Sequence, residues 1–232
     1  MTGVTRKAAL LVALGLVVAS AALAGVPSAA TSIITKTLVP LAPITFIDVV
    51  GQNGVVDPFG KFYVIVKDIG GNLLAGRLVT VDFINATDIR LLTTQVPAGQ
   101  TNTCNKASVI SDINGVAQFT IGGGAKDFGG LNTVTDGVLN SIVVAADGFV
   151  IGYVAAAVYD LNGALGGGAG VSSTDGSILS TDNGVFGGPG NPLYKARCDY
   201  NHDGFQSSLD GSLMSTLRGF GSSAGAGGTY CP

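Results

Sequence analysis

The chain has 232 residues, a formal net charge of −3, and acidic residues that are all Asp. Glycine is abundant, with 36 residues, whereas only 12% of the residues are charged. An acidic surface argues against nucleic acid as a partner, and this composition favours strands, turns and metal loops over long helices. We therefore expect a mainly β protein.

Residues 1–24 have the layout of a secretory signal peptide. Two basic residues precede an almost wholly apolar run over residues 8–24, and small residues follow. Cleavage after Ala24 releases a chain that starts at Gly25, and cleavage after residue 30 is the alternative. An uncleaved membrane anchor is the rival interpretation, but the run is short for a span. We expect a secreted protein, extracellular or at the cell surface, with no membrane segment after cleavage.

Short alternating segments separated by Gly, Asn and Asp turns follow the signal. Residues 31–43 form a first edge strand or a linker, and the alternation then becomes regular at residues 62–68 and 77–83. A turn is expected at residues 69–72, and hairpin turns are expected at residues 112–115 and 147–148. Further strand candidates are residues 90–94, 107–111, 116–121, 141–146 and 149–158. The spacing predicts an antiparallel β-sandwich over residues 31–158.

Part of this region resembles a known kind of module. The phrase FYVIVKDIGGNLLAGRLVTVDF gives a strand, a D-x-G-G-N turn, an L-A-G step and a second strand, and SDINGVAQFTI follows it. These phrases resemble the immunoglobulin-like (invasin-type) domains of secreted and surface proteins of bacteria. The resemblance implies an immunoglobulin-like sandwich that presents something, and it implies no reaction.

Residues 199–210 match a calcium-binding loop of the EF-hand type position by position. Such a loop takes oxygen ligands at positions 1, 3, 5, 7, 9 and 12 and turns sharply at a glycine at position 6, here Gly204. Asp210 at position 12 is one methylene shorter than the usual Glu. An ordinary Asp/Asn/Gly-rich surface turn is the alternative, but we favour a calcium site. Its ligands are Asp199, Asn201, Asp203, the Phe205 carbonyl, Ser207 and Asp210.

A degenerate copy of this pattern lies upstream. Residues 171–180 repeat the pattern of residues 206–215, but the loop before them is longer and has glycines where the position 5 carboxylate belongs. The remaining candidate ligands are Asp160, Asn162 and Asp175. Because more chain must be ordered around fewer carboxylates, we expect a weaker calcium site or none.

The two repeats, each a loop that runs into a short helix, resemble the type I dockerin module over residues 159–232. The resemblance implies two calcium loop–helix units that dock an exported protein onto cohesin modules. In this family, loop positions 10 and 11 contribute to partner recognition, and the corresponding residues are Ser173, Thr174, Ser208 and Leu209. Apolar residues after the loops, namely Ile178, Leu179, Leu209, Leu213 and Leu217, are expected to pack the two helices together.

Three cysteines fit a protein in an oxidising compartment. Cys198 immediately precedes the calcium loop and Cys231 is the penultimate residue, so we expect a disulfide between them that closes the last helix onto the start of the loop. Cys104 is then a free or buried thiol. A catalytic role for it needs a base, and the only histidine, His202, lies inside the calcium loop.

The sequence contains no Ser-His-Asp arrangement outside that loop and no phosphate-binding Gly-rich loop with its Lys, so we expect no enzyme. We expect a secreted display, adhesion or structural protein whose C-terminal module is stabilised by calcium. One alternative is an adaptor that docks to a cohesin-like receptor through that module. Another is a subunit of an extracellular filament or surface layer.

Overall fold

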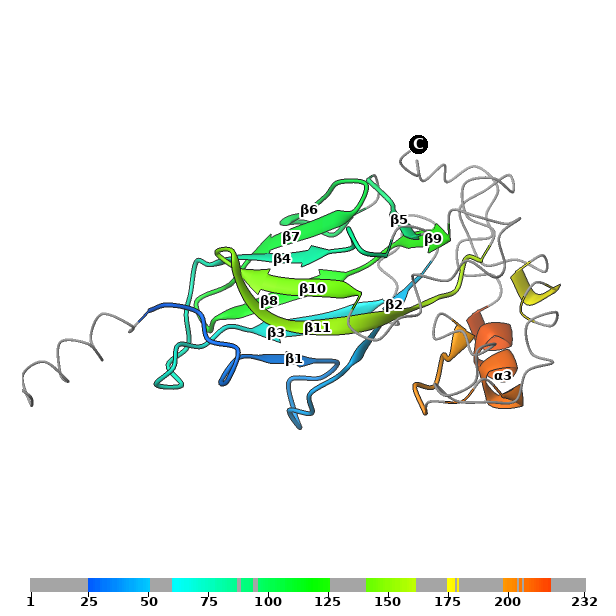
Figure 1. Ribbon diagram of the computed structural model, residues 1–232, viewed down its shortest axis with the longest axis horizontal. Coiled ribbons are helices and arrows are strands. Elements are labelled where there is room, and N and C mark those ends of the chain that lie inside the picture. Colours follow the sequence, from blue (N-terminus) through cyan, green and yellow to red (C-terminus); the bar gives the residue numbers. More distant parts are fainter. Residues whose placement is uncertain are drawn as a thin grey trace, which may run out of the picture.

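The computed structural model describes residues 25–50, 60–86, 89–93, 96–125, 141–161, 175–177, 179, 198–203, 205 and 207–217 (Figure 1). This part of the chain is mainly β. Its strands are β1 (Ile33–Thr35), β2 (Phe46–Val49), β3 (Lys61–Ile65), β4 (Leu78–Asp82), β5 (Ile89–Leu91), β6 (Gln100–Asn102), β7 (Lys106–Ile110), β8 (Val116–Thr120), β9 (Gly123–Ala125), β10 (Ile142–Ala146) and β11 (Phe149–Val158), and helix α3 (Ser208–Leu217) follows. No described helix has the length and apolar character needed to cross a bilayer.

Two main sheets carry the fold. One has three strands in the order β1-β3-β8, the other has six in the order β2-β11-β10-β4-β7-β6, and β5 pairs with β9 in a small third sheet. The predicted antiparallel arrangement is confirmed for most pairs, but β2 runs parallel to β11, with Phe46 opposite Ala155 and Val49 opposite Val158. A strand near the start of the domain therefore lies beside the last one.

The alternation of apolar and polar residues along the strands determines which side chains form the core. Alternate residues of β3 and β4, such as Phe62 and Val79, are fully buried and belong to one cluster that both main sheets share. Phe62 stacks on Phe119 of β8 across neighbouring strands, with ring centroids 5.3 Å apart. Alternate residues of each strand thus form one apolar layer between the sheets.

Of the two predicted hairpin turns, the one at residues 147–148 is confirmed. Asp147 and Gly148 both have positive φ, 48° and 82°, and connect Ala146 of β10 directly to Phe149 of β11, as an Asp-Gly turn predicts. The turn at residues 69–72 is held by a bond from the Asp68 N–H to the Asn72 carbonyl.

The third turn, at residues 112–115, was wrongly predicted to be a hairpin. It joins β7 of the six-stranded sheet to β8 of the three-stranded sheet, and these two strands do not pair with each other. The Asp112 carboxylate accepts hydrogen bonds from the N–H groups of Asn114 and Val116 and so forms the turn locally. Local turn chemistry is the same whether the flanking strands pair or diverge.

Candidate metal centre

Helix α3 begins with a capping box. The Ser207 hydroxyl accepts a hydrogen bond from the Leu209 N–H at 3.2 Å, and the Ser207 N–H donates to Oδ2 of Asp210 at 2.6 Å. This reciprocal pattern is that of an S-x-x-D capping box, which satisfies N–H groups at the helix N-terminus. The last position of the candidate calcium loop is therefore also a helix-capping residue.

The other carboxylate oxygen of Asp210 reaches back to the start of the loop. Oδ1 accepts hydrogen bonds from the N–H groups of Tyr200, at 2.7 Å, and Asn201, at 3.2 Å. The Asp210 side chain is fully buried. One carboxylate thus joins positions 2, 3 and 9 of the loop to position 12.

Between these ends the chain makes two successive Asx turns. Oδ1 of Asn201 accepts from the Asp203 N–H at 3.1 Å, and Oδ1 of Asp203 accepts from the Phe205 N–H at 2.8 Å. His202, between them, has a φ of 59°, a left-handed conformation that non-glycine residues seldom adopt. These turns curl the backbone and keep side-chain oxygens close to the loop.

The predicted ligands differ in burial and are only partly gathered. Asp199 and Asp210 are buried, Asn201 and Ser207 are half-buried, and the side chains of Asp203 and Phe205 are exposed. Their oxygen donors have the chemistry that calcium prefers. However, within the described ranges no three His, Cys, Asp or Glu side chains come close enough together to hold a metal ion. A bound cation would have to draw the exposed Asp203 towards the two buried carboxylates.

The degenerate repeat is described at fewer positions. Asp160 and Asp175 are both fully buried, whereas Asn162, Ser173 and Thr174 lie outside the described residues. Of the predicted partner-binding residues that are described, Ser208 and Leu209 are exposed on the first turn of α3.

The two repeats share an apolar cluster with the end of the sandwich. Leu161 and Leu179 from the first repeat pack in it with Met214 of α3, and Leu213 lies against it. Packing between the repeats is therefore confirmed, but the predicted stripe on α3 is wrong in part. The spacing predicted that Leu209 and Leu213 face the cluster, but Leu209 is exposed. The fully buried residues of α3 are Asp210 and Met214, each one position further along the helix.

The cysteine assignment needs correction. Cys198 is fully buried and is a thiol, and Cys104 is the cysteine that is disulfide-bonded. The predicted bridge from Cys198 to Cys231 is thus wrong at its Cys198 end, and Cys231 itself lies outside the described residues. Cys198 packs in the same cluster as Tyr159 and Tyr200, where it serves as a small apolar side chain.

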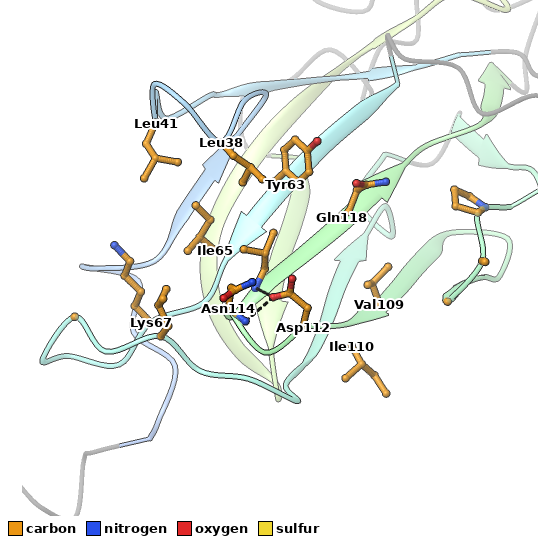
Figure 2. Close-up of a pocket in the computed structure, with 16 residues that line it drawn as sticks. Leu38, Leu41, Tyr63, Ile65, Lys67, Val109, Ile110, Asp112, Asn114 and Gln118 are labelled. Atoms are coloured by element: carbon orange, nitrogen blue, oxygen red, sulfur yellow. Dashed lines mark hydrogen bonds between the residues drawn. The ribbon is translucent and has the colours of Figure 1, made fainter.

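A groove of about 940 Å³ is lined by residues of β3, β7 and β8 and of the segment between β1 and β2 (Figure 2). Its floor includes Tyr63 and Ile65 of β3, with Gln118 of β8 beside them. Leu38 and Leu41 flank it on one side and Val109 and Ile110 on the other. The lining is mostly apolar and carries no constellation of acid, base and nucleophile.

No protein-family model matches the chain, and comparisons with curated proteins and with solved structures find no match either.

Proposed function

We propose that the protein is a secreted, non-catalytic display, adhesion or structural protein whose C-terminal loop and helix are stabilised by calcium. The observation that carries this proposal is the arrangement of residues 199–210. Asp210 joins both ends of the loop, and two Asx turns lie between them. This arrangement accompanies oxygen donors at all six positions where an EF-hand-type loop requires them.

Charge gives calcium a physical role in this loop. Asp199, Asp203 and Asp210 place three carboxylates within twelve positions, and two of them are buried. Removing carboxylates from water is costly unless a positive charge compensates. A divalent cation supplies that charge, so occupancy and folding of the loop are expected to be linked.

The strand order supports an immunoglobulin-like sandwich. The letters A, B and E can be assigned to β1, β3 and β8, and C, F and G to β4, β10 and β11; the other five strands fall outside this comparison. An immunoglobulin fold places A, B and E in one sheet and C, F and G in the other. The two main sheets divide the same strands in the same way. Such a sandwich serves as a rigid scaffold that displays loops and appended modules.

One observation favours a second candidate, an adaptor that docks to a cohesin-like receptor. Leu209, an apolar residue at a predicted recognition position, is 60% exposed at the start of α3, next to the exposed Ser208. Capture of the chain by cohesin modules in calcium buffer, lost in Leu209→Asp, would support the adaptor. Absence of capture would leave the display protein as the better interpretation.

Thermal unfolding in calcium and in chelator tests the calcium proposal. A ligand that binds only the folded state at about 100 times its Kd stabilises that state by about 2.7 kcal/mol. We expect calcium to raise the unfolding temperature of the wild type and of Asp112→Ala, which removes a comparable exposed Asx turn from the sandwich. Asp203→Ala should lose most of the increase. Identical melting curves for the wild type in calcium and in chelator would contradict the proposal.

A further inference from the structure

Along β11, the outer face of the six-stranded sheet is covered at one end. Val154, Ala156 and Val158 point into the core, so Ala155 and Ala157 point outward, yet both are fully buried. Tyr153, which precedes them on the same outward face, is 50% exposed. Something other than the opposite sheet therefore covers the two outward alanines.

The neighbouring strand β2 shows the same feature. Ile47 and Val49 belong to the core, whereas Phe46 and Asp48 alternate with them on the outward side and are nevertheless buried. In the parallel register, Phe46 lies opposite Ala155, and the two pack together. Alanine on β11 leaves room above the sheet for a third layer.

The first half of the candidate calcium loop supplies that layer. Tyr200 stacks on Tyr159 with ring centroids 4.2 Å apart, and its hydroxyl donates to the Val158 carbonyl at 3.1 Å. Tyr200 also belongs to the cluster that contains Ala157. Cys198, two residues before Tyr200, packs in this cluster as well.

Two residues after Tyr200, the His202 ring stacks on Phe46, with centroids 4.9 Å apart and an angle of 18° between the planes. Nε2 of His202 lies 3.2 Å from Oδ1 of Asp48. The other oxygen of Asp48 is paired with Lys36. The loop thus touches β2 through a ring and an ionisable pair.

These contacts follow a period of two along the chain. Cys198, Tyr200 and His202 face the sheet, and they alternate with the candidate ligands at positions 1, 3 and 5 of the loop. The segment is not a β-strand, yet alternate residues contact the sheet and the residues between them are the candidate ligands, so one short segment contributes to both surfaces. The left-handed conformation of His202 adapts the end of this segment to the turn.

We propose that this segment is a calcium-operated clamp on β2, an inference that rests on the proposed calcium binding. β2 has four residues and is the edge strand of the six-stranded sheet among the described residues, so within that sheet it pairs on one side only, although Ile44 before it and Val50 after it bond to other segments. When calcium orders the ligand positions, it also fixes Tyr200 and His202, which lie between them and pack against the sheet. Because coupling between two sites is reciprocal, the contacts with β2 in turn strengthen calcium binding.

Hydrogen exchange and calorimetry on the full mature chain, with calcium chloride as the probe, test the clamp. In the wild type we expect calcium to slow exchange of the β2 amides about tenfold or more relative to chelator. His202→Ala should still bind calcium, about fivefold or more weakly, and should lose most of the protection of β2. Tyr153→Ala, which removes an exposed ring from the same face of β11, should behave as the wild type.

The outcomes that would overturn the clamp are distinguishable. If the wild type binds calcium and exchange of β2 does not change, only the clamp fails. The clamp also fails if His202→Ala protects β2 as fully as the wild type does. If the wild type gives no binding heat, the proposed function fails and the clamp with it. Should His202→Ala not fold, Asp48→Asn replaces it, and calcium protection of β2 undiminished in that variant would overturn the clamp.

Discussion

Ser207 and Asp210 cap helix α3 together, with the Ser207 N–H donating to the Asp210 carboxylate at 2.6 Å. The same carboxylate oxygen accepts the Ser207 hydroxyl at 3.2 Å, and its partner oxygen accepts two N–H groups from the start of the loop. A capping residue contributes stability without any metal. The stability that calcium adds must therefore be measured relative to the stability that the cap already provides without metal.

The capping role predicts an effect of Ser207→Ala that persists in chelator. Loss of the hydroxyl that accepts from the Leu209 N–H should cost about 1 kcal/mol of unfolding free energy. Ser212→Ala is the matched control, because the Ser212 hydroxyl only bonds back to the Ser208 carbonyl within the exposed helix. Chemical denaturation in chelator checks both variants. Equal stability of Ser207→Ala and the control would show that the cap contributes nothing.

Asp68 predicts an acid-sensitive contribution to stability. Hydrogen bonds from the Asn72 side chain, and then from the backbone N–H groups of Asn72, Gly25 and Gly70, hold the pKa of Asp68 below its usual value. A folded-state pKa below the unfolded one stabilises the fold above the unfolded pKa, which is about 3.9. That stabilisation is lost as the pH falls through the folded-state value.

Asp68→Asn removes this titration. We therefore expect the wild type to exceed the variant in stability at neutral pH, and the difference to shrink as the pH falls below about 4. Denaturant unfolding at a series of pH values measures the difference. A difference that stays constant from pH 7 to pH 3 would contradict the assigned role of the Asp68 carboxylate.

The thiol state of Cys198 predicts a specific labelling pattern. Because the side chain is fully buried, iodoacetamide should leave it unmodified in the native protein. In denaturant without reductant, Cys198 should be alkylated, whereas Cys104 should require reductant first. Mass spectrometry of the peptides checks this order. Cys198 that is alkylated only after reduction would restore the disulfide expected from the sequence.

Gln100 protects the free edge of β8. Its side-chain amide donates to the Thr120 carbonyl at 3.0 Å and accepts from the Thr120 N–H at 3.0 Å, as a neighbouring strand would. Gln100→Ala should cost about 1–3 kcal/mol, because buried backbone groups lose their partners. The opened edge should also favour self-association.

Gln118→Ala is the control for Gln100→Ala, because Gln118 lies on β8 itself, two residues before Thr120, and its side chain is exposed. Unfolding measurements and size-exclusion chromatography compare the two variants. A Gln100→Ala protein that is as stable and as monomeric as Gln118→Ala would contradict the protective role.

Local sequence signals predicted much of the fold. Alternation identified the buried faces of β3 and β4, and the Asp147-Gly148 pair identified its hairpin, because both signals act within a few residues. β2 was missed. All four of its residues are buried, so it shows no alternation, and its partner β11 lies about a hundred positions away.

The candidate site was predicted in part. The ligand positions could be listed from the spacing, and the S-x-x-D pattern at Ser207 could also have predicted the start of α3. What the spacing could not supply was the packing of Tyr200 and His202 on the sandwich, because their contacts are with residues far away in the sequence. The disulfide was also mispredicted, because the position of Cys198 next to the loop in the sequence does not determine whether its side chain can reach another cysteine.

Calcium titration of the protein by isothermal calorimetry tests the proposed calcium binding most directly. We expect saturable binding of at least one calcium ion per chain, with binding largely lost in Asp203→Ala and retained in Asp112→Ala. A wild-type protein that is folded by circular dichroism and shows no saturable calcium binding at millimolar concentrations would contradict the claim.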